Sequence, residues 1–468
     1  MSKFSNLFAA QDMTQGEPWK KISAFAVPLL IGNIAQQMYN TADSVIVGKY
    51  VGDNALAAVG GSGPLINLLI VLFVGIATGA GIMVAQYYGA RRSEDLANSV
   101  GTCMLLTLVS SIAMMIAGTL LAEPMLHLLN TPEEIHDMCL AYMRIYFLGI
   151  AGMAYYNILA GVLRGLGDSI SALKYLIVAA LANIVLDLLL VAVVGMGVDG
   201  AALATIASQF FSAALSARKL FSMRDVMHLK KEHFRFNKHY AAQLVRLGMP
   251  SGLAQAVMSA SSMVVQSLTN SFGAVFVACN TIVMRVDGFV MMPNFSFGNA
   301  MTTYTGQNIG ARRLDRVEQG IKAGLKLAVG TAVVLVAAIL LFGRQLMGLF
   351  TDTPSLVDMS MRMMTIIAPG YIAFAVTQCL SGTMRGAGDT TTPMWISFFT
   401  TIVIRVPLAY IFAYLTRNTG YPHGRPESLF ASLLVAWLMG ALINTAAFKR
   451  GKWRRKSGLA DEDRSSEA

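Results

Sequence analysis

The sequence predicts an all-α polytopic membrane protein, with twelve transmembrane helices in two six-helix lobes that are related by a pseudo-twofold axis. Composition is the first reason: 55% of the 468 residues are hydrophobic and 13% are charged, whereas an ordinary soluble domain is about 25% charged. Second, apolar stretches of about 20 residues, long enough to cross a bilayer core of about 30 Å, recur from end to end. Third, two motifs repeat at one constant spacing.

The repeated motifs divide the chain into two halves. The segment QYYGARR at residues 86–92 returns as QNIGARR at 307–313, and GVLRGLGD at 161–168 returns as GTMRGAGD at 382–389. Both pairs are 221 residues apart (307 − 86 and 382 − 161). Because each half holds an even number of helices, both halves enter the membrane from the same side, as in transporters that rock about a site between two halves.

Six apolar stretches form the predicted first lobe, each bounded by polar or charged residues. The first begins after Lys20 and Lys21 and contains Pro28, which predicts a bend, either a working hinge or a static kink. The second ends before Arg91, and the last two are joined by a short Gly-Met-Gly turn at 195–197. The helices are predicted over about 22–46, 54–86, 96–121, 138–162, 170–195 and 199–220.

Six further stretches form the predicted second lobe, after the most basic connection of the chain. In the first of these stretches, Pro250 is the near counterpart of Pro28, in agreement with the repeat. The helices are predicted over about 240–268, 275–306, 320–342, 356–382, 392–415 and 428–448. The predicted domain limits are therefore 1–20 for the N-terminus, 21–220 for the first lobe, 221–238 for a linker, 239–448 for the second lobe and 449–468 for the tail.

The formal net charge of +10 lies in the connections rather than in the apolar stretches. Lys and Arg gather at both chain ends and after every second helix, and the positive-inside rule places these segments in the cytoplasm. We therefore expect a multi-pass protein of a prokaryotic plasma membrane with both termini cytoplasmic. This distribution suits an anionic membrane surface rather than nucleic acid, so the expected partners are lipid and small molecules, and the expected state is monomeric.

Motifs of enzymes are missing from the sequence. It contains no GxxxxGK[ST] phosphate-binding loop and no HExxH zinc motif. The four cysteines lie in or beside apolar stretches without metal-ligand or disulfide spacing, and we interpret them as packing residues: Cys103, Cys139, Cys279 and Cys379. The sequence thus predicts a protein that is not an enzyme and that uses no cofactor.

One apolar stretch, residues 180–191, contains an acid. It holds Asn183 and Asp187 among aliphatic side chains, and a carboxylate at the centre of such a helix costs roughly 2.5–3.5 kcal/mol on translocon scales. The two residues are four apart and share a helix face. Asp43 of the first helix and Thr205 of the sixth fall at a similar depth in the outer half of the bilayer. Together the four residues predict a dry site for a proton or Na⁺.

Two plainer interpretations stay open at this point. Asn183 and Asp187 also suit a polar clasp that holds two helices together, and Asp43 also suits the wet outer mouth, where it would cap a helix. No other metal ion is predicted beyond Na⁺ at these four positions.

Polar and flexible side chains mark candidate positions for a substrate cavity. Gln36 and Asn40 are four apart, on the face of the first helix that also holds Asp43. In the eighth helix, Met284 and Met291 supply flexible thioethers, which suit a surface that accepts many apolar shapes. Ordinary packing against lipid or protein is the alternative explanation for most of the methionines.

The eighth helix also carries two charges, Arg285 and Asp287, which complete the set of cavity candidates. Residues two apart do not face each other, so the two do not form an intrahelical pair. Each is expected to pair across helices, and Arg405 of the eleventh helix is one candidate partner for Asp287. A structural role and a substrate-binding role both remain open for these charges.

These features together resemble the multidrug and toxic compound extrusion (MATE) family of antiporters, in particular its DinF-like branch. The resemblance covers about residues 20–450 and is carried by the segment YNTAD at 39–43, both repeated motifs, and the Asn183 and Asp187 pair followed by GAA at 200–202. It implies twelve helices in two lobes and outward export of drug-like, often cationic, compounds against H⁺ or Na⁺. It also implies a first-lobe cation site made by Asp43, Asn183, Asp187 and Thr205.

The chain departs from some relatives in its second lobe. They carry cation-binding carboxylates in helices 7 and 10, whereas here the predicted helix 7 has none and helix 10 has only Asp358, near its outer end. A second-lobe cation site of that kind is therefore not expected. The alternative function is a lipid-linked oligosaccharide flippase of the same superfamily, which would prefer a strongly basic cavity and extra helices. A membrane-embedded enzyme or receptor is a more remote alternative.

Overall fold

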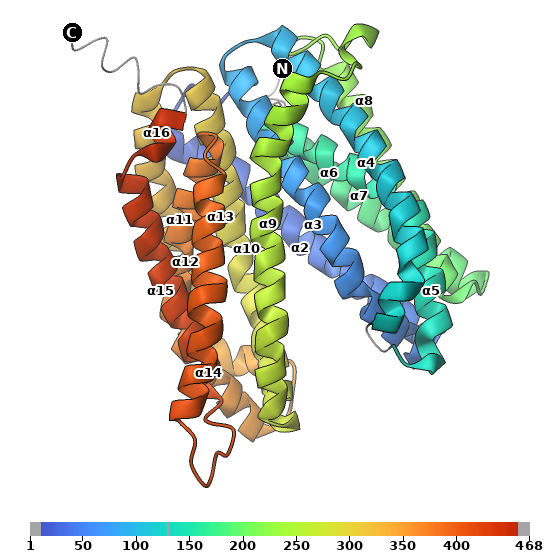
Figure 1. Cartoon of the computed structure of the whole chain (residues 1–468), viewed down its shortest axis with the longest axis vertical. Coiled ribbons are helices and arrows are strands. Elements are labelled where there is room, and N and C mark those ends of the chain that lie inside the picture. Colours follow the sequence, from blue (N-terminus) through green and yellow to red (C-terminus); the bar gives the residue numbers. More distant parts are fainter. Residues whose placement is uncertain (1–10, 129–130, 457–468) are drawn as a thin grey trace. The chain divides into compact units, whose positions relative to one another are not determined.

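The computed structural model describes residues 11–128 and 131–456, and most of them are helical (Figure 1). The first half contains α2 (Pro18–Tyr50), α3 (Asp53–Gly89), α4 (Ser93–Leu128), α5 (Glu133–Leu148), α6 (Ile150–Gly165), α7 (Ser169–Asp187), the π-helical η1 (Leu188–Val193) and α8 (Gly197–Ser222). The second half contains the short 3₁₀ helix η2 (Lys231–His233), α9 (Lys238–Ser271), α10 (Ala274–Gly310), α11 (Leu314–Gly348), α12 (Pro354–Gly386), α13 (Thr391–Phe398), the π-helical η3 (Phe399–Arg405), α14 (Val406–Leu415), α15 (Glu427–Lys449) and α16 (Lys452–Lys456).

The prediction of one continuous helix over 138–162 is wrong, because α5 and α6 are separate helices that meet at a bend of 52°. Gly149 stands at the bend with φ −97° and ψ 6°. A Cβ at this position would overlap the side chain of Ile206 in α8, so the close approach of α8 to the bend requires glycine. The other predicted stretches fall within single helices or consecutive helical segments, except that the stretch 170–195 runs two residues past the end of η1.

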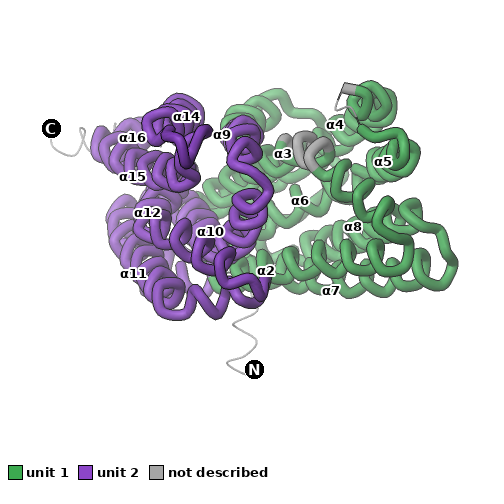
Figure 2. Tube along the Cα trace, turned by 90° about the horizontal axis from the view of Figure 1, so that it is seen from below, with its two compact units in different colours: residues 1–12, 27–252 green, residues 13–26, 253–468 purple. Residues whose placement is uncertain are grey.

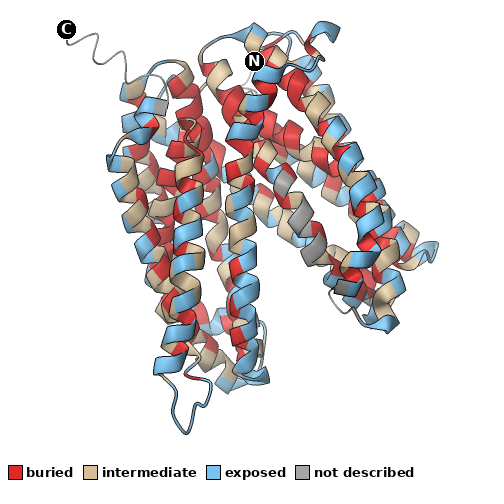
Figure 3. Cartoon of the chain, in the orientation of Figure 1, coloured by how far each residue is buried: buried red, intermediate tan, exposed pale blue. Residues whose placement is uncertain are grey.

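The all-α membrane fold predicted from the sequence is confirmed. Within the described residues, eight helices are long and apolar enough to cross a membrane, or nine if α5 and α6 form one span. Buried residues line the inner faces of the helices of each unit, and exposed residues lie on their outer faces (Figure 3). Many of the exposed residues are large and apolar, such as Leu341, which is 72% exposed. Such outward apolar faces suit contact with lipid. The four cysteines are free and buried, as expected of packing residues.

The repeated motifs build matching turns in the two halves. In each copy of the first motif one arginine has a positive φ, 54° at Arg91 and 57° at Arg312, in a region that residues other than glycine rarely occupy. The N–H of the following residue, Arg92 or Arg313, then closes the helix end by donating to the carbonyl five residues back, at 3.1 and 2.8 Å. The second motif supplies acidic residues that accept from main-chain N–H groups in the first turn of the next helix, Asp168 and Asp389.

The structure divides into two compact units, coloured separately in Figure 2. Unit 1 comprises residues 1–12 and 27–252, and unit 2 comprises residues 13–26 and 253–468. The boundaries therefore fall inside α2 and α9, so the start of each of these helices belongs to one unit and its remainder to the other. The domain limits proposed from the sequence stay a prediction.

Residues 13–26, the exchanged start of the chain, are held in unit 2 by hydrogen bonds. Arg316 Nη2, in the first turn of α11, donates to the carbonyl oxygens of Met13 at 3.2 Å and Gly16 at 2.9 Å. Two residues further along α11, Glu318 pairs with Arg454 of α16 at 2.6 Å. The described chain ends thus lie at the same end of unit 2.

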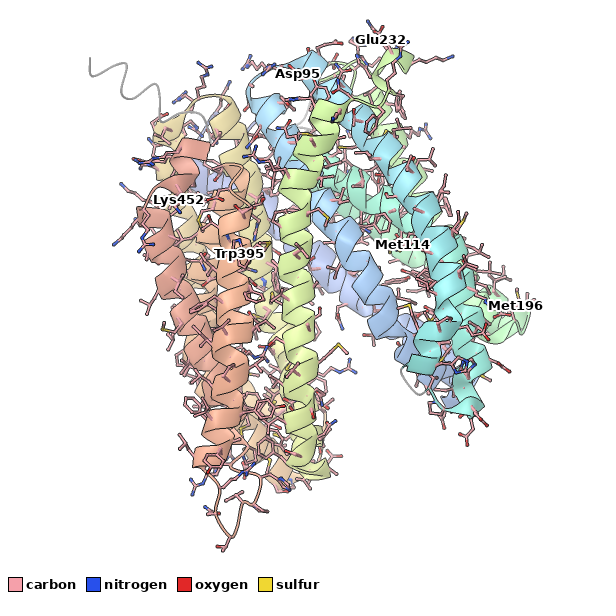
Figure 4. The ribbon with its side chains drawn as sticks, in the orientation of Figure 1. Asp95, Met114, Met196, Glu232, Trp395 and Lys452 are labelled. Carbon is pink, nitrogen blue, oxygen red and sulfur yellow. The ribbon has the colours of Figure 1, made fainter. Side chains whose placement is uncertain are left out.

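Unit 1 holds the segment before α9 in a corresponding way. His233 Nε2 lies 3.1 Å from Glu94 Oε1 in the first turn of α4. Asp95 and Glu232 lie toward one end of unit 1, and Met196, in the turn before α8, lies toward the opposite end (Figure 4). The segment before α9, which contains Glu232, and the turn before α8 thus lie toward opposite ends of unit 1.

Candidate functional site

Three helices of unit 1 bring the predicted site residues to one level. Asp43 lies seven residues before the end of α2, Asp187 is the last residue of α7, and Thr205 lies eight residues after the start of α8. The turns at these helix ends adjoin, since a Cβ at Gly197 would lie 3.7 Å from the side chain of Val51. With a rise of 1.5 Å per residue, all three side chains lie about 10 Å below this end of the unit.

Asn183 fixes one oxygen of Asp187. With its amide oriented so that nitrogen faces the acid, Nδ2 donates to Asp187 Oδ2 at 2.7 Å, and Oδ1 accepts from the main-chain N–H of Thr205 at 3.2 Å. Both Asn183 and Asp187 are 0% exposed. The i, i+4 spacing thus builds a bond within α7, and the amide then ties α7 to α8.

The acids of α2 and α7 face each other. The carboxyl groups of Asp43 and Asp187 approach within hydrogen-bonding reach, and Oδ1 of each is buried without a hydrogen-bond partner. Two carboxylates cannot donate to one another, and both ionised would repel at short range. The arrangement is therefore complete only when a proton or a small cation lies between them.

Aromatic residues that the sequence reasoning missed surround this pair. Tyr39 of α2 approaches the Thr205 side chain and lies close to both acids, and Tyr142 of α5 is also close to both acids. Tyr39 is four residues before Asp43, so the rule that identified Asn183 could have identified it. Tyr142 had no such signal, because its partners lie on other helices. These two side chains supply hydroxyl oxygens near the acids.

A π-helical segment, η1, begins directly after Asp187. Such segments are rare and occur frequently at functional sites. Its sequence, LLLVAV, is an ordinary aliphatic run, so its composition does not predict a π-helical segment. The acid therefore lies at an irregularity in the helix rather than in its regular part.

The candidate residues for a substrate cavity differ in how far they are exposed. In α2, Gln36 is half-buried like Asp43, while Asn40 is exposed. In α10, Met284 is 50% exposed and Met291 is half-buried. These positions form accessible faces in their own units, and their role in substrate binding stays a prediction.

The charged candidates of α10 differ from each other. Arg285 is exposed, whereas Asp287 is half-buried and accepts a hydrogen bond from Tyr371 Oη of α12 at 2.7 Å. Arg405, at the end of η3, is close enough for electrostatic attraction to Asp287. The predicted pairing of Asp287 with Arg405 stays a prediction, and Tyr371 is a partner of Asp287 that the sequence did not indicate.

Residues 11–128 and 131–456 contain no cluster of three or more His, Cys, Asp or Glu side chains that could hold a metal ion. The oxygen-rich environment of Asp43 and Asp187 suits Na⁺ or a proton rather than a transition metal.

Comparisons with known proteins identify a family that both halves of the chain match. A family model described as MatE matches residues 28–189 and 250–411, two segments whose starts are 222 residues apart (250 − 28). The probable multidrug resistance protein YoeA of Bacillus subtilis is 30% identical over 436 residues, which cover 91% of this chain and 94% of the relative. YpnP of the same bacterium, also described as a probable multidrug resistance protein, is 28% identical over 449 residues, which cover 95% of this chain and 98% of the relative. A crystal structure of MATE in the bent conformation has a TM-score of 0.88 at 25% identity and covers 99% of both chains.

Proposed function

Because this chain belongs to the MatE family of multidrug efflux transporters, we propose that it exports drug-like, often cationic, compounds in antiport with H⁺ or Na⁺ through the Asp43 and Asp187 pair. It is a multi-pass membrane protein of a transporter family. A lipid-linked oligosaccharide flippase is not favoured, because the relatives are described as multidrug resistance proteins.

One observation carries the choice of residues: the carboxyl groups of the half-buried Asp43 and the buried Asp187 face each other, and no Lys or Arg side chain of the described residues acts on either. A proton or Na⁺ neutralises the pair, and its departure restores the repulsion between the acids. The repulsion between the two acids therefore differs between the loaded and the unloaded pocket. We infer that the ion shifts the conformational equilibrium because one conformation, in which the acids face each other, binds it more tightly than the other. Asn183 keeps Asp187 oriented in both states.

The orientation in the membrane follows from charge. The described chain ends lie together beside the start of α11, next to the basic turn at 307–313. The positive-inside rule favours the cytoplasmic side of a prokaryotic plasma membrane for this end. We propose that both termini are cytoplasmic, that the chain acts as a monomer, and that it needs no cofactor beyond the coupling ion.

Transport into everted vesicles under separate Na⁺ and pH gradients tests the proposal. Asp187→Asn is expected to reduce gradient-driven export to the level of passive leak, while the protein stays folded. Asp168→Asn is the matched control, since Asp168 is also buried but caps α7, and asparagine caps a helix as well as aspartate does. Undiminished gradient-driven export by Asp187→Asn would rule out the proposed coupling role.

A further inference from the structure

Unit 2 carries a compact hairpin at residues 416–426, between α14 and α15, which projects beyond the ends of both helices (Figure 1). Both neighbouring helices belong to segments that are long and apolar enough to cross a membrane, Thr391–Leu415 and Glu427–Lys449. The hairpin therefore joins two membrane spans at the point where they leave the bilayer, and we expect it at the membrane surface.

Hydrogen bonds fix the shape of this hairpin. The side-chain oxygen of Asn418 accepts from the main-chain N–H groups of Gly420 at 3.0 Å and Tyr421 at 2.9 Å, and Asn418 and Tyr421 also bond through their main chains. At the base of the hairpin, Thr416 Oγ1 accepts from the N–H of Arg425 at 2.8 Å. The hairpin is thus formed in advance, so a ligand that binds it does not have to order the chain.

The two arginines of the hairpin are exposed, and each lies over a tyrosine ring. The guanidinium carbon of Arg417 is 5.3 Å from the ring centroid of Tyr414, and that of Arg425 is 5.7 Å from the ring centroid of Tyr421. Such stacking holds a guanidinium group by its face and leaves the N–H groups at its edge available for an anion. Each pair thus presents a positioned set of hydrogen-bond donors.

No acid of the hairpin balances this charge. Residues 416–426 include two arginines but neither Asp nor Glu. Neither arginine belongs to an ion pair of the described residues, and Glu427, the acid that follows the hairpin, pairs with Arg362 at 3.3 Å. The hairpin therefore presents net positive charge to its surroundings, and an anion is the complementary partner.

The position of this charge relative to the membrane is unusual. Helix α15 separates the hairpin from the basic tail that follows Lys449. Its 23 residues span about 35 Å at 1.5 Å per residue, which is more than the bilayer core of about 30 Å. The positive-inside rule favours the cytoplasm for the tail, so the hairpin lies on the outer side, where arginines are not favoured. Their presence there calls for a specific ligand.

We propose that the hairpin binds the phosphate of an anionic phospholipid headgroup at the outer surface of the membrane, through Arg417 and Arg425. A planar guanidinium group bonds two phosphate oxygens at once. Tyr414 and Leu415, which are 67% and 71% exposed, suit the boundary between headgroups and acyl chains, whereas a soluble anion would contact only the arginines. The choice of leaflet rests on the orientation proposed above, and the binding itself does not depend on export.

A fluorophore attached through Thr419→Cys places a reporter on the hairpin, since Thr419 is exposed and the four native cysteines are buried. The full-length protein is incorporated into phosphatidylcholine nanodiscs that contain a minor fraction of spin-labelled phosphatidylglycerol or, for comparison, spin-labelled phosphatidylcholine. We expect the anionic lipid to quench the reporter at a roughly 5-fold lower content, which is the factor that one arginine near an anionic surface contributes. Equal quenching by the two lipids would overturn the proposal.

Matched variants separate binding at the hairpin from an effect of net charge. Arg417→Gln/Arg425→Gln should abolish the preference for phosphatidylglycerol. Arg344→Gln/Arg362→Gln removes the same amount of charge from unit 2, but these two arginines, 71% and 72% exposed, each pair with an acid, so the preference should stay within about 2-fold of wild type. Equal loss in both double variants would show that the lipid responds to net charge alone, and the hairpin would not be its site.

The shape of the hairpin gives an independent readout. Asn418→Ala removes the side-chain bonds to the N–H groups of Gly420 and Tyr421 and keeps both arginines. The preference for phosphatidylglycerol should therefore fall by roughly 3-fold, because the lipid must then order the loop. An unchanged preference in this variant would overturn the claim that a preformed hairpin makes the site.

Two further measurements distinguish the ligand and the leaflet. Millimolar inorganic phosphate, compared with chloride at equal ionic strength, should leave the quenching unchanged, and displacement of the lipid by phosphate would assign the arginines to a soluble anion instead. In whole cells, a membrane-impermeant maleimide should label Thr419→Cys. Labelling confined to everted vesicles would overturn the outer leaflet and the proposed position of the termini, while the coupling role of Asp187 would still stand.

Discussion

At the scale of single residues, Asn183 determines how the acid of α7 is presented. Its amide bonds the Asp187 carboxylate on one side and the Thr205 N–H on the other, so its removal leaves the buried Oδ2 of Asp187 unpaired and unties α7 from α8. Asn183→Ala should cost about 1–3 kcal/mol and raise the ion concentration for half-maximal export by roughly 10-fold or more.

The maximal export rate of Asn183→Ala should fall less than in Asp187→Asn, because the charge of the pocket is retained. Titration of export against Na⁺ or pH measures this. Asn157→Ala is the matched control, since the Asn157 amide donates to Met153 O of its own helix at 2.9 Å. Equal shifts in the two variants would show that Asn183 has no special role in the pocket.

Thr205 gives a second prediction at this scale. The sequence suggested its side chain as a ligand, but the bond to Asn183 uses its main-chain N–H, which every residue except proline retains. Thr205→Val should therefore keep Asp187 oriented and lose only the approach of the hydroxyl to Tyr39. We expect a smaller shift in ion dependence than for Asn183→Ala, measured in the same titration. A larger shift would assign the hydroxyl a direct part in binding the ion.

Helical spacing rules predict only some of the contacts around Asp187. Asn183 and Asp187 could be paired from the sequence because both lie on one helix, four residues apart. The approach of Asp43 to Asp187 was predicted from depth in the bilayer, which gives a level but not a contact. Tyr142 could not be assigned to the pocket, since its position depends on how α5 packs against other helices.

At the scale of helices, the bend between α5 and α6 depends on a single missing side chain. Gly149→Ala would place a methyl group against Ile206 of α8, and overpacking of this kind costs about 1–3 kcal/mol. The midpoint of thermal unfolding in detergent should therefore fall. Because the obstacle is a side chain, adding Ile206→Val should restore part of the loss.

Gly330 provides the control for this substitution. It lies inside α11, where an added Cβ meets nothing within 4 Å. Gly330→Ala should be neutral or stabilising by up to about 1 kcal/mol, because alanine favours the helix. A similar loss at both positions would mean that packing against α8 is not the reason for glycine at the bend.

Hydropathy predicts helices well but not their interruptions. The twelve apolar stretches follow from composition, because the bilayer permits few other structures for the main chain. The bend at Gly149 and the π-helical segments η1 and η3 lie inside those stretches. The residues of η1 are as apolar as their neighbours, and the bend at Gly149 depends on the contact with Ile206 of α8, so hydropathy marks neither of them.

At the scale of the whole molecule, the two units exchange the starts of their first helices. The repeat at a spacing of 221 residues indicated two related halves, but no change of composition marks the boundaries inside α2 and α9. Continuous helices hide the exchange from any reading of the sequence. Each half of the chain thus contributes a segment to the unit built mainly by the other half.

This exchange predicts how the halves behave when the chain is divided. Fragments 1–222 and 223–468, produced together, should assemble and copurify, because residues 13–26 belong to unit 2 and residues 223–252 belong to unit 1. Deleting residues 1–16 from the first fragment should reduce recovery of the second by roughly 10-fold, since it removes the carbonyl groups of Met13 and Gly16 that Arg316 binds. Hydrogen bonds to a charged group contribute about 1.5–3 kcal/mol each.

Arg316→Ala in the second fragment should reproduce this loss, because it removes the donor of the same bonds. Arg313→Ala is the matched control: Arg313 pairs with Asp315 at 2.9 Å, and both side chains are 52% exposed, so the pair contributes little. The fraction of the second fragment retained by a tagged first fragment measures the effect. Equal retention with Arg316→Ala and Arg313→Ala would show that the exchanged start of the chain does not hold the halves together, and the continuous helix α9 would then have to carry that association.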